Sequence, residues 1–285
     1  METVTHKLIA LLDVVPQGGD HFIGDSEDLG FPNVFGGQVL GQALMAGSRT
    51  VEGRLAHSMH AYFLRPGDPT RAIDYEVQRV RDGGTFSTRR IIARQQEREI
   101  LTAMVSFQVE EAGFEHQLAM PDAPDPESLT SEQELRKQLE PLMPADRRER
   151  LMKPRAIDMR PVDPLDPRQP EKRPPHKQTW LRAEGELPDD QVMHRALLAY
   201  ASDFSFLATS VQPHGVTFFD PRMQVASLDH ALWFHRPLRM DDWLLYDKDS
   251  PSAAGGRGFN RGNLFSRDGT MVASVCQEAL IRKRQ

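Results

Sequence analysis

Asp203 is a carboxylate surrounded in sequence by apolar residues, a pattern that can hold a general base. It lies in a stretch, 192–210, whose apolar periodicity predicts one continuous helix. No neighbour at helical spacing carries a cation that could pair with it. A carboxylate among apolar groups costs free energy unless it is hydrogen-bonded or protonated, so Asp203 is a candidate base. An acid tolerated by solvent on a helix surface fits the same pattern.

Gln277 is the only polar side chain on one face of a predicted strand, 271–281. Its amide offers both a hydrogen-bond donor and an acceptor. Leaving such a group unsatisfied in the interior costs about 1–3 kcal/mol, so it needs partners. Those partners are either a reactant or the backbone of a neighbouring loop.

Ser227 lies in another alternating stretch, 224–236, which predicts a single strand. Its hydroxyl could hold a water molecule, although a lone serine on a strand commonly has no such role. The alternation predicts that one face carries Val225, Ser227, Asp229, Ala231 and Trp233.

Gly36 and Gly37 begin a second helix-like stretch, 36–51. Paired glycines at a helix start let a ligand approach backbone N–H groups, and the helix dipole favours a developing oxyanion there. Close packing of the helix on a sheet would also explain them. The stretch contains no acid, so a catalytic acid is expected only from the second half of the chain.

The motifs of several other enzyme classes are missing. No H-E-x-x-H motif and no Cys/His cluster occur, so we expect neither a metal site nor a bound cofactor. The glycine-rich run 255–258 lies between predicted strands, which indicates a loop rather than a dinucleotide-binding turn. No G-x-S-x-G motif occurs, which argues against an α/β-hydrolase.

We expect the side chain of Cys276 to lie in the core rather than to act as a nucleophile. The sheet-flanking histidines are expected to be surface or hydrogen-bonded core residues, namely His57, His60, His230 and His235.

The two halves of the chain resemble each other, since each has a helix followed by strands. The strands before a turn end alike, with YFLRP at 62–66 and WFHRP at 233–237. Such an internal repeat indicates duplication, and we predict an α+β fold with one helix and one antiparallel sheet per half. A zone rich in proline and charge, with a short helix at 131–142, indicates a connector. The predicted helices are 36–51 and 192–210, and the predicted strands are 57–65, 86–94, 100–109, 224–236, 260–266 and 271–281.

Composition excludes some partners and compartments. The net charge of −6 argues against a nucleic-acid-binding protein, because phosphate-binding domains usually carry a basic excess. The single cysteine fits a reducing compartment. No signal peptide and no run of about 18 apolar residues are recognisable, so we expect a cytoplasmic protein without a membrane span.

Five motifs resemble those of the TesB-like acyl-CoA thioesterase II family. They are FGGQVLGQA at 35–43, HSMHAYFLRPG at 57–67, YASDFSFL at 200–207, ASLDHALWFHRP at 226–237 and VASVCQE at 272–278. The resemblance covers nearly the whole chain and is weakest in the connector. It implies a double hot-dog fold, which we divide into repeats at 1–118 and 151–285 and a connector at 119–150.

The resemblance also implies cofactor-free hydrolysis of acyl-CoA to a free fatty acid and CoA. It implies a triad of an acid on the second helix, a serine or threonine on the following strand and a glutamine on the last strand. Asp203, Ser227 and Gln277 occupy these positions. Gly36 and Gly37 are candidates for polarising the thioester oxygen. Acyl-CoA is the expected partner, and a homo-oligomer is expected because hot-dog sheets commonly pair.

Two other functions stay open at this point. A hot-dog hydratase or dehydratase acting on enoyl or hydroxyacyl thioesters would be expected to carry D-x-N-P-x-H on its helix, whereas Asp203 has no nearby histidine after it. A non-catalytic acyl-CoA-binding module would have no need to combine Asp203 with Ser227 and Gln277.

Overall fold

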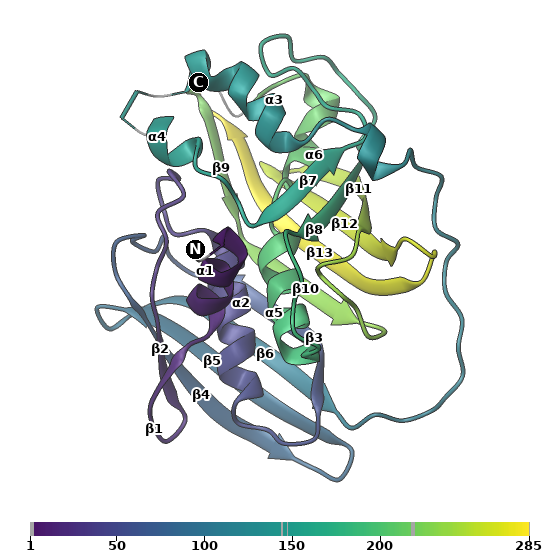
Figure 1. The fold of residues 1–285 in the computed structure, drawn as a ribbon. Helices are drawn as coiled ribbons and strands as arrows, with labels where there is room; N and C mark the ends of the chain where they lie inside the picture. Colours follow the sequence, from purple (N-terminus) through teal and green to yellow (C-terminus); the bar gives the residue numbers. More distant parts are fainter. Residues whose placement is uncertain (1–2, 144, 147, 218–219, 285) are drawn as a thin grey trace.

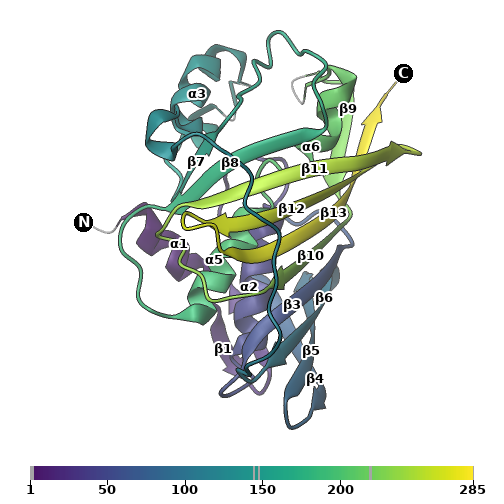
Figure 2. The same cartoon turned by 90° about the vertical axis from the view of Figure 1, so that its right-hand side faces the viewer.

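The computed structural model describes residues 3–143, 145–146, 148–217 and 220–284. The strands in these ranges form one antiparallel sheet of 13 strands, in the order β1-β2-β4-β5-β6-β3-β10-β13-β12-β11-β8-β7, with β9 also paired to β13. Figure 2 shows this sheet as one curved surface that continues through both halves of the chain. The predicted α+β architecture, with helices packed on an antiparallel sheet, is confirmed.

The first half contributes two helices and six strands. These are α1 (Val4–Leu12), β1 (Val15–Gly18), β2 (His21–Gly24), α2 (Gly36–Ser48), β3 (Leu55–Phe63), β4 (Ile73–Asp82), β5 (Phe86–Gln95) and β6 (Arg98–Gln108).

The second half follows a short helical region. That region holds η1 (Pro126–Ser128), α3 (Glu132–Leu139), η2 (Glu140–Leu142) and α4 (Arg148–Leu151). The second half holds β7 (Ile157–Pro161), β8 (His176–Ala183), α5 (Gln191–Ser202), α6 (Ala208–Val211), η3 (Gln212–His214), β9 (Met223–Ser227), β10 (Asp229–Phe234), β11 (Leu244–Ala254), β12 (Arg257–Ser266) and β13 (Met271–Lys283).

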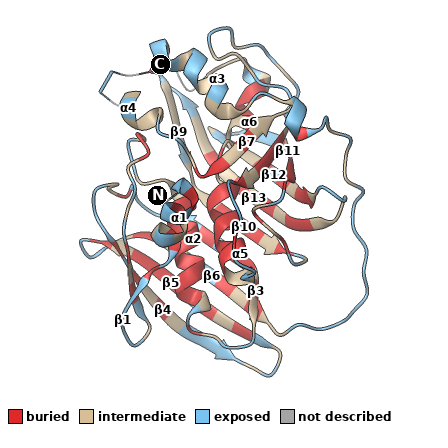
Figure 3. Cartoon of the chain, in the orientation of Figure 1, coloured by how far each residue is buried: buried red, intermediate tan, exposed pale blue. Residues whose placement is uncertain are grey.

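The two halves meet through a strand pair and a helix pair. Strands β3 and β10 are antiparallel neighbours, with Tyr62 opposite Asp229 and Ser58 opposite Trp233. Helices α2 and α5 lie side by side on one face of the sheet (Figure 1). Both helices are largely buried, as their red colour in Figure 3 shows. The main hydrophobic core therefore runs across the junction without interruption.

Glycines allow α2 and α5 to approach each other closely. A Cβ atom on Gly37 would lie 2.2 Å from the carbonyl oxygen of Tyr200, and one on Gly41 would lie 3.0 Å from that of Ala196. Low residue numbers on α2 match high numbers on α5, so the helices are antiparallel. The N-terminus of α2 consequently meets the C-terminus of α5.

The predicted continuous helix at 192–210 is wrong in its second part. Helix α5 ends at Ser202, Asp203 is its C-cap, and a separate short helix begins only at Ala208. Between them Ser205 has a left-handed φ of 59°. Phe206 is fully buried beside the ring of Tyr246, and this tertiary packing outweighs the local preference for helix.

The predicted strand 224–236 is also wrong, because a bulge divides it into β9 and β10. Ser227 lies opposite Ala279 on β13, whereas Ala231 lies opposite Cys276. Four steps along one strand therefore match three along the other, which is the geometry of a β-bulge. The extra residue reverses the alternation, so Ser227 and His230 both reach the inner side of the sheet, and the predicted face shared with Ala231 does not form.

Several elements have no counterpart among the predicted ones, namely α1, β1, β2, β4, β7, β8 and β11. Charged residues interrupt the apolar pattern of some of them. Lys248 of β11, for example, is only 1% exposed, although lysine usually indicates a surface position.

The connector combines helical and extended segments. The predicted helix 131–142 is confirmed as α3 and η2, and a capping box between Ser131 and Glu134 fixes its start. Before it, the chain runs along the outside of the second half (Figure 1), where Gln117 hydrogen bonds to Gly269 and to Met271. Among the described residues, no helix is long and apolar enough to cross a membrane.

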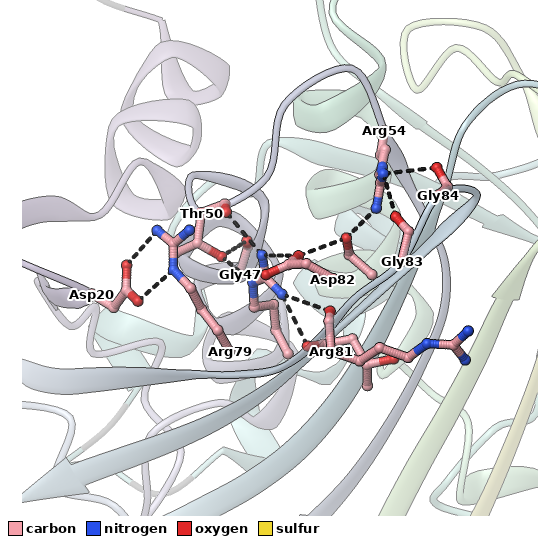
Figure 4. A network of polar contacts seen from close by, with 12 residues as sticks. Asp20, Gly47, Thr50, Arg54, Arg79, Arg81, Asp82, Gly83 and Gly84 are labelled. Carbon is pink, nitrogen blue, oxygen red and sulfur yellow. Dashed lines mark hydrogen bonds and ion pairs between the residues drawn. The ribbon is translucent and has the colours of Figure 1, made fainter.

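A polar network fixes the segment that follows α2 (Figure 4). Arg89 is 1% exposed and donates hydrogen bonds to Thr50 and to the carboxylate of Asp82. Arg54 donates to the carbonyl oxygens of residues 83–84. These partners offset the cost of burying a guanidinium group. The network ties the chain after α2 to the β4–β5 hairpin, which holds the C-terminal end of this helix in place.

Candidate active site

Asp203, Ser227 and Gln277 come together at the junction of three elements. The Nε2 atom of Gln277, on β13, lies 2.7 Å from Oδ1 of Asp203, at the end of α5. The same nitrogen lies 3.1 Å from Oγ of Ser227, at the end of β9. The Ser227 hydroxyl is 3.5 Å from Oδ1 of Asp203, at the outer limit of a hydrogen bond. The three residues singled out from the sequence thus form one cluster.

Asp203 is a buried acid that is held by hydrogen bonds and, among the residues that the structure describes, has no cationic partner in an ion pair. Its side chain is 7% exposed. Burial raises the pKa of this carboxyl, while hydrogen bonds from Gln277, the backbone N–H of Gly37 and Ser227 oppose that rise. The residue lies between two helix ends: the C-terminus of α5 disfavours its charge, and the N-terminus of α2 favours it.

The two glycines at the start of α2 lie directly against the acid. A Cβ atom on Gly36 would lie 2.7 Å from Oδ2 of Asp203 and 3.0 Å from the ring of Phe63. The N–H of Gly37 is already directed at the carboxylate. Gly36, Phe63 and Ser227 are partly exposed, so this side of the cluster faces solvent.

Gln277 is fully buried, yet one side of its amide lacks a partner. Its Nε2 group faces Asp203, Ser227 and His230. Its Oε1 atom accepts no hydrogen bond from any residue in the described ranges. This buried amide oxygen is therefore an unsatisfied hydrogen-bond acceptor within the cluster.

His230 belongs to the same cluster, although its sequence pattern only indicated a sheet or core histidine. Its side chain is 2% exposed, and its Nδ1 atom lies 3.2 Å from Nε2 of Gln277. Burial lowers the pKa of His230 to about 3, so the imidazole is neutral at physiological pH. One feature of the sequence could have indicated this position. His230 alternates with Leu232 and Phe234, so it is the one polar residue on the buried face of β10.

Other residues with reactive side chains lie outside the cluster. Cys276 is partly exposed on the opposite side of β13 from Gln277, so the prediction that it belongs to the core is wrong. Its thiol is half-buried, and this burial raises its pKa, which lowers its reactivity. Within the described ranges, no three residues of the His, Cys, Asp and Glu types are grouped so that they could hold a metal ion.

Two surface cavities lie elsewhere. One, of about 300 Å³, is formed mainly by α3 and β7, and another, of about 440 Å³, is formed by residues 162–163, 173–174, 176–178 and Gln212. Asp203, Ser227 and Gln277 line neither of them.

Comparison with known proteins gives matches in both halves of the chain. Residues 26–108 match the model of an acyl-CoA thioesterase N-terminal domain, and residues 160–280 match that of an acyl-CoA thioesterase. The chain is 40% identical to acyl-CoA thioesterase 2 of Haemophilus influenzae over 283 residues, 99% of each chain. It is 36% identical to human acyl-coenzyme A thioesterase 8, covering 95% of this chain and 88% of that protein.

A solved structure supports the same assignment at the level of the fold. The crystal structure of the acyl-CoA thioesterase II TesB2 from Mycobacterium marinum has 39% sequence identity and a TM-score of 0.78, covering 98% of this chain and 99% of that chain. The predicted double hot-dog fold is confirmed. The chain belongs to the acyl-CoA thioesterase family.

Proposed function

We propose that the protein, an acyl-CoA thioesterase that hydrolyses acyl-CoA to a free fatty acid and CoA, does so by direct attack of a water molecule held by Asp203, Ser227 and Gln277. The observation that carries this proposal is the convergence of the three side chains, with Gln277 Nε2 at 2.7 Å from Asp203 and 3.1 Å from Ser227. Membership of the acyl-CoA thioesterase family supplies the substrate class and the bond that is broken.

Asp203 is the general base in this mechanism. A base works best when its pKa lies near the working pH, and burial moves the pKa of Asp203 upward from the ordinary aspartate value of 3.8. In the described part of the chain, no cation forms an ion pair with Asp203 that would cancel this effect, because the ring of His230, 4.0 Å away, is neutral. The carboxylate is therefore able to take a proton from water.

Gln277 and Ser227 orient the same water. The free Oε1 of Gln277 can accept one hydrogen of that water, while Asp203 accepts the other. The Ser227 hydroxyl is close enough to both residues to complete the set of contacts. Fixing both hydrogens directs a lone pair of the water toward the carbonyl carbon, which reduces the entropic part of the barrier.

The N-terminus of α2 serves the site through Gly36 and Gly37. The N–H of Gly37 holds the base, as its hydrogen bond to Asp203 indicates. The N–H of Gly36, as the first residue of a helix, has no intrahelical acceptor and is the candidate donor to the thioester oxygen. Its side toward Phe63 and Ser227 is partly exposed, so a substrate can approach it.

The bonds formed and broken in the hydrolysis can be accounted for without a protein nucleophile. The water oxygen forms a bond to the carbonyl carbon while its proton moves to Asp203. The tetrahedral intermediate collapses, the carbon–sulfur bond breaks, and the electron pair leaves on the CoA sulfur. A thiol has a pKa of about 8.5, so its thiolate is a good leaving group and needs little acid catalysis. The proton on Asp203 passes to the sulfur or to solvent.

Release of free CoA tests the proposal against its rivals. The protein is incubated with an acyl-CoA and a thiol reagent, and we expect thiol to appear at the rate at which acyl-CoA disappears. A hydratase would transform an enoyl-CoA without releasing thiol, and a binding module would change neither signal. Mass spectrometry of the quenched reaction should find no acylated Ser227 or Cys276, since an acyl-enzyme would contradict direct attack by water.

Assembly, compartment and domain division belong to the same proposal. A homo-oligomer is supported by the exposed apolar side chains of Tyr62 and Met104, which are 61% and 39% exposed on neighbouring strands β3 and β6. Light scattering on the purified chain measures the assembly.

A cytoplasmic location is supported by the single cysteine. The division into 1–118, 119–150 and 151–285 predicts that limited proteolysis cuts first within the connector.

A further inference from the structure

We infer that His230, together with Ser202, is a positioning residue that fixes the amide of Gln277 with its oxygen toward the attacking water. The inference rests on the proposed role of Gln277 in holding that water. His230 does not touch the substrate in this scheme, and it acts only through Gln277.

His230 lies behind Gln277, between the sheet and the end of α5. Its ring packs edge-to-face against Phe206, with 5.9 Å between ring centroids. One ring nitrogen, Nδ1, faces Gln277 at 3.2 Å, and the other, Nε2, faces the hydroxyl of Ser202 at 2.9 Å. The imidazole therefore bridges the last turn of the helix and the glutamine on β13.

The hydroxyl of Ser202 determines which ring nitrogen carries the hydrogen. That hydroxyl lies 3.0 Å from the carbonyl oxygen of Ala199, to which it donates its single hydrogen. It can then only accept from His230, so the hydrogen of the imidazole is on Nε2. The Nδ1 atom is left with a lone pair, and Gln277 must donate to it.

This arrangement permits only one orientation of the Gln277 amide. Its Nε2 group lies within 3.2 Å of three acceptors, on Asp203, Ser227 and His230. Rotating the amide by half a turn would put its oxygen against a carboxylate and an imidazole lone pair, which repel it. The oxygen is therefore held on the opposite side, where it lacks a partner in the described part of the chain.

Asp203 alone could not keep this orientation throughout the reaction. When Asp203 accepts the proton of water, it becomes a donor as well as an acceptor, and the reversed amide would then be tolerated beside it. His230 is buried and neutral, and Asp203 lies 4.0 Å from its Nδ1 atom. Its lone pair does not change during turnover, so it is the constant anchor for the amide.

Kinetics of single variants test the role. We expect His230→Ala to lower kcat roughly 10- to 100-fold, as small misplacements of a reactant do, with KM changed less than about threefold. His230→Asn returns an acceptor oxygen near the position of Nδ1 and should recover most of the loss. His235 is the matched control, because it makes a similar 2.9 Å hydrogen bond to Ser274 outside the cluster. His235→Ala should leave kcat unchanged.

A double-variant cycle separates a positioning role from an independent one. In a Gln277→Ala background, His230→Ala should cause no further loss, because the group through which it acts is already gone. Multiplicative losses would overturn the inference. If Gln277→Ala lost activity while His230→Ala did not, the inference alone would fail. Full activity of Gln277→Ala would sink the proposed function itself.

The tautomer can be measured on the unaltered protein, so a variant that fails to fold does not remove the test. Long-range ¹H–¹⁵N spectra of the full chain should show a neutral His230 with its hydrogen on Nε2. A hydrogen on Nδ1, or a charged ring at the assay pH, would contradict the inference.

Discussion

The two halves share one plan, yet their helices end differently at the junction. In the first half, α2 begins with Gly36 and Gly37 and contains no acid. In the second half, α5 stops at Ser202, and the next residue is the buried Asp203. Because the helices are antiparallel, the bare start of one faces the acidic end of the other. The candidate site therefore depends on both halves, because α2 supplies backbone N–H groups and α5 leads into the acid.

The strands that follow the two helices differ as well. β3 runs as one strand of 9 residues, whereas its neighbour across the junction is divided by a bulge into β9 and β10. The bulge brings Ser227 and His230 to the inner side of the sheet, where both reach Gln277. β3 also has a bulge, between Ala56 and Ser58 against β6, but it stays one strand. A broken helix and a divided strand thus distinguish the half that supplies the polar side chains from the half that supplies backbone groups.

The largest expected effect comes from removing the acid of the second half. Asp203→Asn keeps the size of the side chain but cannot take a proton, so kcat should fall roughly 10²- to 10⁴-fold. Steady-state assays of CoA release measure this, with circular dichroism to confirm folding. Asp249→Asn, a surface acid paired with Arg261, is the control and should retain activity. A loss for Asp203→Asn below about fivefold would remove the base from the mechanism.

The next effect tests the contribution of the first half. Gly36→Ala would place a Cβ atom 2.7 Å from Oδ2 of Asp203 and displace the carboxylate, so we expect kcat to fall roughly 10- to 100-fold. For Gly47→Ala, on the same helix, the nearest atoms to the added Cβ belong to the side chains of Ile91 and Phe107, at 3.3 Å, so activity should change little. Equal effects at the two positions would mean that the start of α2 has no special role.

A smaller effect is expected from the residues that orient the water. Ser227→Ala and Gln277→Ala should each lower kcat, and the double variant should lose less than the product of the two losses, because the residues act as a unit. Ser227→Thr keeps a hydroxyl and should retain most of the activity. Strictly multiplicative losses, measured in the same assay, would show that the two side chains do not share one water.

The substitution Asp203→Asn should raise the free energy of unfolding although it lowers kcat. Burial raises the pKa of Asp203 in the folded protein, so its ionised form costs stability above the folded pKa, and this cost vanishes below the unfolded value of 3.8. Asp203→Asn should therefore be more stable than the unaltered protein at pH 7, with a difference that shrinks as the pH falls toward 3.8. Urea unfolding at several pH values measures the free energy of unfolding. A variant that is less stable at pH 7 would contradict this reasoning.

The smallest effect concerns the other face of β13. Cys276 is next to Gln277 but points to the opposite side, so Cys276→Ser should change kcat less than about twofold. Treatment of the protein with a thiol-blocking reagent should likewise leave hydrolysis intact. In that experiment hydrolysis is measured by the loss of acyl-CoA absorbance. Strong inactivation by either change would mean that the outer face takes part in the reaction.

The sequence by itself indicated three residues of the candidate site and the duplicated plan. Gln277 is recognisable because a single polar residue interrupts an otherwise apolar strand face, and Asp203 because an acid lies among apolar neighbours. The motifs around them also indicate the family, and the comparisons with known proteins confirm it. These signals are local in the chain, so periodicity and residue type are sufficient to read them.

Only the tertiary structure decided how these residues meet. The end of α5 depends on the burial of Phe206 beside Tyr246, and the bulge before β10 depends on pairing with β13, so neither follows from local pattern. His230 joins the cluster because that bulge and the last turn of α5 place it between Ser202 and Gln277. Contacts between segments distant in sequence outweigh local preferences of a fraction of a kcal/mol per residue, which is why the arrangement of the site could not be predicted from the chain alone.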